Sequence, residues 1–327
     1  MSEKSFLQSQ DWGRFQLEVG HTVIPHDGYQ FFETTVPFGK YLYCPHPTIA
    51  SAQEYLASTE VLAKQEQAWF VRVEPNEGSA AFPENSSISP TLSLQPEHTW
   101  HVPLADDATM QAAMHQKTRY NIRVAEKNGV KVSFSQSPDA VAPLLHLLKQ
   151  TADRAEIRLH PASYYQKMLQ LLGADPFEMS SRAESERSGL NQEDKISRSA
   201  RNDNHFTVEV ALAEHDGVNV AGAFLGWWGD TVISLHGGSN YERRSLMAPH
   251  LLHWTAMQRA RDAGRITYDM GGVSPESDEQ HQWAGISRFK RGFGGQTITY
   301  PPAVDIVYNK LAYQAYGMAR KFRRSIR

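Results

Sequence analysis

The sequence predicts an α/β protein with two domains. The chain has 327 residues, a length that fits about two domains of ordinary size. Hydrophobic residues make up 40% of it and charged residues 21%, which is typical of a globular protein with sizeable cores rather than a disordered chain. Strand-like and helix-like segments are mixed in both halves, and this mixture favours an α/β class for each domain.

The first domain is expected over residues 1–136. Helices are predicted at 6–19 and 51–67. Apolar runs bounded by Pro, Gly and Asn predict strands at 29–36, 40–45, 69–73, 88–94, 100–104 and 130–134. Asp106-Asp107 begins a further helix that runs to Lys127, because acidic residues suit a helix start, and Asn128-Gly129 ends it. A C-terminal helix at 311–327 can pack back on this domain.

The second domain is expected over residues 137–310. Helices are predicted at 139–155, 161–172 and 246–263, and strands at 207–213, 218–227, 231–236 and 265–270. Asp216-Gly217 and Gly229-Asp230 are hairpin signals between the first three strands. Residues 180–205 are crowded with charged and polar side chains and contain few large aliphatic ones. We predict a mobile polar insertion there, since it cannot bury enough apolar surface to order itself.

Charge and cysteine content exclude several classes of protein. The formal net charge of −3 does not favour general binding to nucleic acid or membrane. The segment from Lys310 to Arg327 has six basic and no acidic residues. It can attract RNA, anionic lipid or diphosphate, or simply suit the dipole at a helix C-terminus. The single cysteine, Cys44, excludes an intramolecular disulfide and a multi-cysteine zinc site and fits a reducing compartment. Without an apolar run of signal or membrane-spanning length, we expect a cytoplasmic protein with at most peripheral membrane contact.

Common catalytic motifs do not occur in the sequence. There is no Walker A pattern, no GxSxG, no HExxH, and no GxGxxG after a strand. His250 and His253 lie three apart on a predicted helix, but no nearby carboxylate or cysteine completes a metal set. Basic side chains remain: a stripe in QKTRYNIRVAEKNGVKV, and Lys40 after a short turn. Glu74 ends a predicted strand, where a carboxylate can hold a substrate or orient a lysine.

The segment His281–Gly295, HQWAGISRFKRGFGG, is the most informative part of the chain. Helical spacing places Ile286, Phe289 and Phe293 on one face, and Lys290 points away from it. The glycines that follow let backbone approach a ligand closely. A lysine held there can stabilise a developing oxyanion. The alternative is an amphipathic surface helix with a solvated Lys-Arg edge.

Two sets of segments carry a family resemblance. The first half contains, in order, FLQSQDWGRFQ, GKYLYCPH, FVRVEP and KTRYNIRVAEKNGVKV. The second half contains HGGSNYERRSLMAPHLLHWTAMQRARDAGRITYDMGG and then WAGISRFKRGFGG. Together they resemble the Fem family, peptidyltransferases that add amino acids to the peptidoglycan stem peptide. The resemblance runs from Phe6 to about Arg324, and FKRGFGG preceded by YDMGG is its most specific part.

The resemblance implies two acetyltransferase-like (GNAT-related) domains around a substrate groove. It implies transfer of an aminoacyl group from aminoacyl-tRNA to an amine on a UDP-linked or lipid-linked muropeptide, without metal, cofactor or covalent enzyme intermediate. Since 180–205 has no heptad pattern, the chain resembles the members without a coiled-coil arm.

Site residues are carried over position by position. Lys290, with Phe289, matches the pair near the acceptor end of the tRNA and the transferred group. Lys40 resembles the lysine that meets the precursor diphosphate. The other matches at the precursor site are Glu74, Tyr241, Tyr164 and, in place of an expected arginine, Arg158 or His160. Arg288 and Arg291 are expected to face RNA.

Two alternatives remain open. An acyl-CoA-dependent N-acyltransferase of the GNAT type would need a phosphate-binding loop at a helix start. Here Met247, Ala248 and Pro249 stand where glycines are expected. The other alternative is a non-catalytic RNA- or envelope-binding module.

Overall fold

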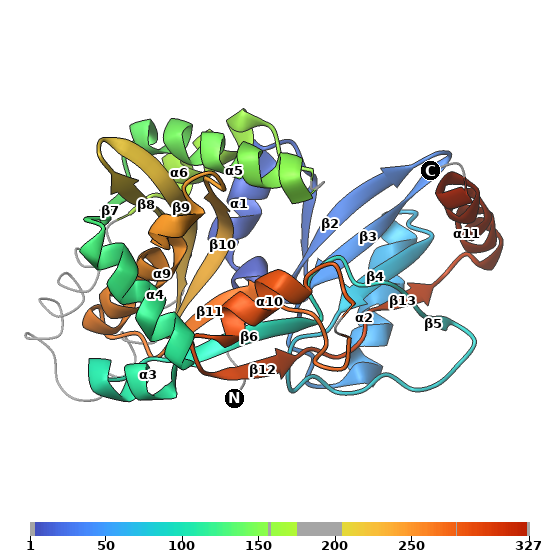
Figure 1. The fold of residues 1–327 in the computed structure, drawn as a ribbon. Helices are drawn as coiled ribbons and strands as arrows, with labels where there is room; N and C mark the ends of the chain where they lie inside the picture. Colours follow the sequence, from blue (N-terminus) through green and yellow to red (C-terminus); the bar gives the residue numbers. More distant parts are fainter. Residues whose placement is uncertain (1–3, 156–157, 175–204, 279, 326–327) are drawn as a thin grey trace, which may run out of the picture. The chain divides into compact units, whose positions relative to one another are not determined.

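Two compact units make up the computed structural model, which describes residues 4–155, 158–174, 205–278 and 280–325 (Figure 1). The first unit comprises Met1–Glu97 and Thr299–Arg327, and the second comprises His98–Ile298. The α/β class expected from the sequence is confirmed, because helices pack on a mixed sheet in each unit.

The first unit is built on a six-stranded sheet. Its strands, in spatial order, are β1 (Val23–His26), β2 (Tyr29–Val36), β3 (Gly39–Pro45), β4 (Phe70–Glu74), β13 (Val304–Val307) and β5 (Ile88–Pro90). Only β3 and β4 are parallel, and α2 (Ala52–Gln65) connects them. Before the sheet come the short helix η1 (Phe6–Gln8) and α1 (Gln10–Glu18), and Ser9 caps α1 by accepting a hydrogen bond from the Trp12 amide.

Alternating residues send side chains to the two faces of this sheet, as the two-residue period of a strand requires. Leu42, Val71 and Ile306 belong to the core covered by α2. Their chain neighbours Tyr41, Phe70 and Val307 form a second core on the other face. The C-terminal helix α11 (Lys310–Ser325) covers that second core through two tyrosines, Tyr313 and Tyr316.

A buried ion pair joins β4 to β13. Nε of Arg72 lies 2.8 Å from Oδ1 of Asp305, and its Nη2 lies 2.8 Å from Oδ2. Both side chains are almost completely buried. The Asp305 carboxylate also accepts a hydrogen bond from the Tyr313 hydroxyl, and the Arg72 guanidinium donates to Thr91. One bidentate pair thus connects two strands and α11.

The second unit is built on a seven-stranded sheet. Its strands, in spatial order, are β12 (Gln296–Thr299), β6 (His98–Pro103), β11 (Thr267–Gly272), β10 (Thr231–Ser239), β9 (Val218–Trp228), β8 (Thr207–His215) and β7 (Lys131–Ser135). The helices are α3 (Asp107–Ala113), α4 (Gln116–Lys127), η2 (Pro138–Ala140), α5 (Val141–Ala155), α6 (Ala162–Leu172), η3 (Arg244–Leu246), α9 (Ala248–Asp262) and α10 (Ala284–Arg291).

Helices cover both faces of this sheet (Figure 1). On β9, Ala223 and Leu225 belong to the core that includes Ile122 of α4 and Met257 of α9. Phe224, between them, stacks on Tyr165 of α6 from the opposite face, with ring centroids 5.8 Å apart. The expected hairpin turn at Asp216-Gly217 joins β8 to β9, and both residues have positive φ.

The domain boundary expected after residue 136 is not where the contacts divide the chain. Strand β6 pairs with β11, and β7 pairs with β8, so residues 98–136 belong to the second unit. Conversely, β13 lies in the sheet of the first unit. The sequence did not reveal this, because the pairing of a strand depends on its partners rather than on its own pattern.

Several elements differ from the sequence prediction. The helix expected to run unbroken from Asp106 to Lys127 is two helices, because Met114 is extended and His115 begins α4 as its N-cap. Strands β1, β12 and β13 were missed; each has only four residues. The insertion expected at 180–205 lies outside the described residues apart from His205.

The described helices include none that is both long enough and apolar enough to cross a membrane.

Removing either member of the Arg72–Asp305 pair should destabilise the first unit strongly. We expect Asp305→Asn or Arg72→Met to lower the free energy of unfolding by about 3–5 kcal/mol, because each leaves a buried charge without its partner. In the double variant Arg72→Met/Asp305→Leu, the free energy of unfolding should fall by less than the sum of the decreases caused by the single changes. Urea denaturation followed by circular dichroism measures this, with the exposed pair Lys64–Glu60 as the control. Equal, small losses for both pairs would contradict the prediction.

Candidate functional site

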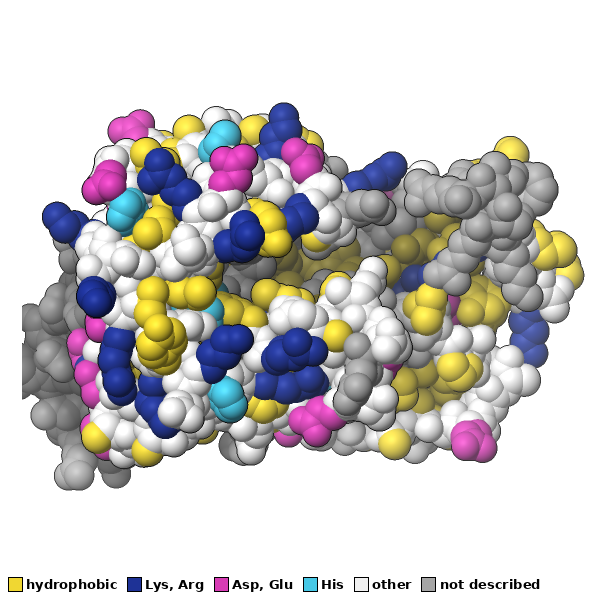
Figure 2. Space-filling view, viewed as in Figure 1, with side chains coloured by type: hydrophobic (Ala, Val, Ile, Leu, Met, Phe, Trp, Pro, Cys, Tyr) yellow, Lys and Arg dark blue, Asp and Glu magenta, His cyan; other side chains and the backbone are white. Residues whose placement is uncertain are grey.

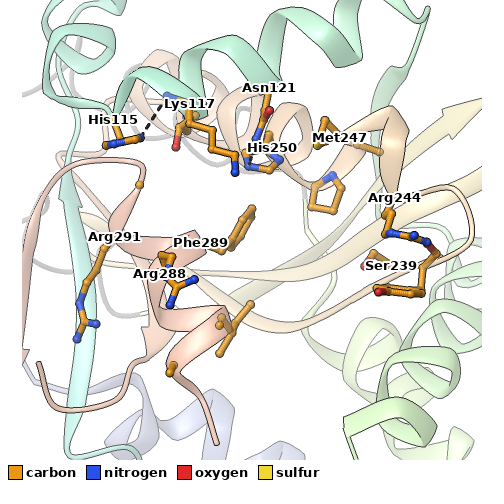
Figure 3. A pocket seen from close by; sticks show the side chains of 18 of the residues that line it. His115, Lys117, Asn121, Ser239, Arg244, Met247, His250, Arg288, Phe289 and Arg291 are labelled. Carbon is orange, nitrogen blue, oxygen red and sulfur yellow. Dashed lines mark hydrogen bonds between the residues drawn. The ribbon is translucent and has the colours of Figure 1, made fainter. Parts of the chain in front are cut away.

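A cleft of about 1270 Å³ opens in the second unit (Figure 3). Its walls come from the start of α4, the segment 239–250 that leads into α9, the loop after β11, and α10. These segments are far apart in sequence, and the sheet of the second unit brings them together. In the space-filling view, Lys and Arg side chains gather on the face where α4 and α10 lie (Figure 2).

Positive charge predominates in the cleft. Among the described residues that line it, the cationic ones are Lys117, Arg243, Arg244, Arg288 and Arg291, and the acidic ones are Glu242, Glu276 and Asp278. The chain as a whole carries a net charge of −3, so this excess is local. A concave surface with an excess of cations attracts and holds anions such as phosphates.

The start of α9 forms part of the cleft wall. Met247, its N-cap, has φ +55°, a left-handed conformation that favours glycine, and no side chain caps the helix. The first-turn amides of a helix attract anions. However, Pro249 removes one of these N–H donors, and the side chains of Met247 and Pro249 fill space in the cleft. The start of α9 is therefore partly apolar and lacks the glycines expected of a pyrophosphate-binding loop.

Phe289 of α10 and His250 of α9 both line the cleft. The Phe289 ring lies 5.0 Å from that of His250 (Figure 3). It also lies 5.6 Å from the ring of His253, which does not line the cleft. Burial lowers the pKa of His250 to about 4, and the charge of Lys117 adds to the effect. His250 is therefore neutral near pH 7, and its Nε2 lies 3.1 Å from Nδ2 of Asn121. These contacts hold the Phe289 ring in one orientation.

Lys290 points to a different part of the unit. Its Nζ donates a hydrogen bond of 2.7 Å to the carbonyl of Gly272 at the end of β11, and it is not among the residues that line the cleft. Burial lowers the pKa of Lys290 to about 8, and the nearby charge of Asp269 opposes that shift. The side chain is thus a partly desolvated ammonium held by backbone. The spacing predicted only its direction, away from that of Phe289.

Asp269 organises the backbone that Lys290 contacts. Its Oδ1 accepts a hydrogen bond of 2.7 Å from the amide of Gly271, which has φ +75°. This turn presents the Gly272 carbonyl to Lys290. His101 of β6 faces the same carboxylate, with its Nε2 3.5 Å from Oδ2. The YDMGG segment therefore positions Lys290, a link that the sequence alone did not suggest.

The glycines after Lys290 have a structural explanation. A side chain on Gly295 would collide with the carbonyl of His101, and one on Gly294 would come within 2.8 Å of the carbonyl of Ala113. Both residues have positive φ. The glycines were expected to let backbone approach a ligand, but the backbone they admit is that of β6 and α3. This close packing fixes the end of α10.

Tyr241 lines the cleft beside two arginines. The residue is 54% exposed, and its ring centroid lies 5.0 Å from the guanidinium carbon of Arg154 and 4.4 Å from that of Arg244. Cations over an aromatic face hold the ring while leaving its edge accessible. Arg244 also donates to the carbonyl of Tyr241. Of the expected precursor-binding residues in this unit, Tyr241 is the one that lines the cleft.

The other expected residues of the second unit lie elsewhere. His160 stacks on Tyr164 of α6 with ring centroids 3.9 Å apart, and the ring of His160 lies 6.2 Å from that of His236. Arg158 is exposed. None of the three lines the cleft.

Arg288 and Arg291, expected to face RNA, differ from each other. Arg288 is exposed and projects from α10 into the cleft region (Figure 3). Arg291 donates a hydrogen bond of 2.6 Å to the carbonyl of Ser274, and its guanidinium carbon lies 5.9 Å from the ring centroid of Trp100. Arg291 therefore also holds the loop that follows β11.

Lys40, in the first unit, is already paired. Its ammonium lies 2.7 Å from Glu33 and 3.1 Å from Glu66. The hydrogen bond to Glu33 contributes most to raising the pKa of Lys40. A diphosphate bound there would have to replace at least one carboxylate.

Glu74, also in the first unit, is 3% exposed. It accepts hydrogen bonds from the Tyr43 hydroxyl at 2.7 Å and from the backbone amides of Leu94 and Gln95. Burial raises its pKa. The carboxylate holds the segment after β5 against the end of β4.

The sequence analysis did not identify several residues that line the cleft, among them Asn121, Arg243 and Arg244. It also did not identify the contact between His250 and Phe289. The adjacent pair in NYERRS was a usable signal, since two arginines before a helix start favour anion binding. The role of Asn121 had no signal, because it depends on α4 packing beside α9.

Comparisons with known proteins identify relatives of this chain. The sequence model of the FemAB family matches residues 93–180 and 174–321. A lipid II:glycine glycyltransferase of Staphylococcus aureus (strain USA300) is 24% identical over 310 residues, covering 79% of this chain and 73% of that protein.

Solved structures share the fold. A crystal structure of FemX matches with a TM-score of 0.69 and 19% identity, covering 95% of this chain and 94% of the other. The C-terminal domain of a putative lysylphosphatidylglycerol synthetase from Agrobacterium fabrum matches with a TM-score of 0.55 and 13% identity, covering 96% and 93%.

The Asp269 charge should control the titration of Lys290. In Asp269→Asn the amide oxygen can still accept the Gly271 hydrogen bond, but the charge that raises the Lys290 pKa is lost, so this pKa should fall below its value of about 8. Lysine ¹³Cε shifts followed by NMR through a pH titration measure it. The exposed Asp153→Asn serves as the control. An unchanged Lys290 titration in Asp269→Asn would show that the carboxylate does not act on the ammonium.

Proposed function

Because this chain belongs to the FemAB family, we propose that it transfers an aminoacyl group from aminoacyl-tRNA to an amine on the stem peptide of a peptidoglycan precursor. The chain is an aminoacyltransferase that forms an amide bond, in keeping with its glycyltransferase relatives. The more detailed proposal rests on the different surroundings of two adjacent residues of α10, Phe289 and Lys290. Phe289 faces a basic cleft, and the adjacent Lys290 holds a partly desolvated ammonium.

In this proposal the cleft receives the acceptor end of the tRNA. Arg288, Arg243 and Lys117 neutralise backbone phosphates, and exposed rings such as Tyr241 provide stacking surfaces for unpaired bases. The basic residues of α4 extend the same charge beyond the cleft. Arg119 is an exception, because it donates to the carbonyls of Gln111 and Met114 and caps α3.

The reaction is an exchange of an ester for an amide. The acceptor amine attacks the ester carbonyl, and the resulting tetrahedral oxyanion collapses as the C–O bond to the terminal ribose breaks. The amine loses a proton, and the leaving hydroxyl gains one. Lys290 does not line the cleft, so in this proposal the aminoacyl end of the tRNA passes Phe289 to reach the end of β11. There the Lys290 ammonium stabilises the oxyanion with an N–H that Gly272 does not use. Positioning of two large substrates contributes the rest, so neither an enzyme nucleophile nor a metal is required.

Lys40, Glu74, Arg158, His160 and Tyr164 remain proposals for the precursor site. To bind the precursor diphosphate, the Lys40 ammonium would have to give up its ion pair with Glu33 or Glu66. The acceptor is UDP-linked or lipid-linked, and the reaction takes place in the cytoplasm, at the inner face of the membrane when the acceptor is lipid-linked.

Acyl-CoA-dependent acylation is the alternative outcome. It would require the α9 start to bind a pyrophosphate, which Pro249 and the side chain of Met247 oppose. Thermal stabilisation by CoA thioesters and not by muropeptide precursor would favour it over the proposed reaction.

Replacing Lys290 should abolish catalysis selectively. With labelled aminoacyl-tRNA and a muropeptide precursor, we expect Lys290→Met to lower kcat by about 10²–10³-fold, the cost of removing one oxyanion partner, with precursor affinity nearly unchanged. Since the ammonium of Lys290 is charged below its pKa of about 8 and neutral above it, wild-type kcat should fall as the pH rises through that value. This decrease of kcat with rising pH should be absent in Lys290→Met.

The control for this experiment is Lys149→Met, an exposed lysine on α5. Wild-type turnover in Lys290→Met would refute the oxyanion role. Failure of folded wild-type protein to transfer any amino acid would refute the reaction itself.

Arg288 should contribute to binding of the donor through charge. In Arg288→Gln, tRNA binding should weaken, and the slope of log K against log salt should decrease by about one, since one phosphate contact is lost. Filter binding across a salt series measures the slope, and Arg14→Gln, an exposed arginine on α1, is the control. An unchanged slope in Arg288→Gln would place the RNA elsewhere.

A further inference from the structure

The outward side of α4 carries an exposed aromatic residue among basic ones. Tyr120 is 63% exposed, and Lys117, Arg123 and Lys127 are exposed as well. At 3.6 residues per turn, Lys117, Tyr120 and Lys127 lie within about 80° of one another around the helix axis, and Arg123 lies about 40° beyond Lys127. The buried residues of α4 lie on its other side. Lys117, Tyr120, Arg123 and Lys127 are named here the α4 stripe.

The three cations of the α4 stripe form no ion pair with another described residue. Glu126, the exposed acid of α4, follows Lys117 by nine residues, which is about two and a half turns, so the two side chains point to opposite sides of the helix. On the neighbouring helices α3 and α9, Asp107 and Asp262 both pair with Arg261. An anionic partner can therefore approach the stripe without displacing a carboxylate from it.

The α4 stripe continues the positive surface of the cleft. Lys117 belongs to both, since it lines the cleft from the start of α4, and Figure 3 shows it on the wall facing Arg288 of α10. From Lys117 to Lys127 the helix rises by about 15 Å. A polyanion with one end in the cleft could thus extend along α4 and still meet cations. Figure 2 shows Lys and Arg side chains gathered on this face.

The composition of the α4 stripe favours base-paired RNA over other anions. Lysine and arginine bind backbone phosphates, and a tyrosine hydroxyl can donate to a phosphate or a ribose hydroxyl. An unpaired strand would instead need several aromatic faces on which its bases could stack. An anionic bilayer would need a wide apolar face. Tyr120 is the one large exposed hydrophobic side chain of α4, so neither of these requirements is met.

We propose that the α4 stripe binds the base-paired stem that adjoins the unpaired 3′ end of the donor RNA. Lys117 contacts the junction between the unpaired end and the stem, and Arg123 and Lys127 contact phosphates of the stem. Tyr120 donates its hydroxyl to a phosphate or a ribose between them. The inference rests on the proposed function for the identity of the RNA and for the end that occupies the cleft, but binding can be tested without turnover.

The test compares two RNAs on the full chain by fluorescence anisotropy across a salt series. One is a hairpin with an unpaired 3′ end, and the other is a single strand with the same 3′ end. Wild-type protein should bind the hairpin more tightly. Arg123→Gln/Lys127→Gln should weaken hairpin binding about tenfold or more and decrease the slope of log K against log salt by about two, with binding of the single strand unchanged. Tyr120→Phe should weaken hairpin binding by a smaller factor and leave the slope unchanged, because it removes no charge.

The matched control is Arg14→Gln/Lys149→Gln, which removes an exposed arginine from α1 and an exposed lysine from α5. Arg288→Gln, in the cleft, should weaken binding of both RNAs. Unchanged hairpin binding in Arg123→Gln/Lys127→Gln would overturn the proposal, even where Arg288→Gln weakens binding and transfer occurs.

Two further results would also overturn it. One is an equal loss of affinity for the hairpin and the single strand. The other is binding to phosphatidylglycerol vesicles that the stripe variant loses while its hairpin binding stays intact, because this would assign the stripe to a membrane. If folded wild-type protein binds neither RNA, the proposed function fails together with this inference.

Discussion

The insertion of β13 between β4 and β5 is the constraint on which the first unit depends. The Arg72–Asp305 pair that anchors it joins residues 233 positions apart, so the chain must return to its starting sheet after building the entire second unit. The second unit makes this return possible. Its first and last strands, β6 and β12, are neighbours at one edge of the sheet, and they bring the two ends of the long excursion together.

Within the second unit, adjacent residues of the short helix α10 lie in different environments. Successive residues on a helix point about 100° apart, so Phe289 can face the cleft while Lys290 reaches the end of β11. The glycines that follow allow α10 to end in contact with β6 and α3. Burial lowers the pKa of Lys290, and the charge of Asp269 opposes that shift. The same few residues therefore both hold Lys290 in place and set the pKa of its ammonium.

Charge is distributed locally rather than globally. The chain is slightly acidic, yet cations predominate in the cleft and in the C-terminal segment. Some basic residues that look alike in the sequence have structural tasks, such as Arg119 at the end of α3 and Arg291 at the loop after β11. Such an arrangement limits non-specific attraction while concentrating the field where an anionic partner would bind.

The sequence by itself determined the α/β class, most of the longer helices and strands, the family resemblance, and the different directions in which Phe289 and Lys290 point from their helix. Those features depend on local periodicity, turn residues and contiguous motifs. Only the tertiary structure decided the unit boundary, the place of β13, the break before His115, and the partners of Lys40 and Glu74. Val304–Val307 is too short to be recognised as a strand, and its aspartate becomes favourable only because a buried arginine lies on the neighbouring strand. Such pairings join residues far apart in the chain, and their energies depend on burial that no local pattern records.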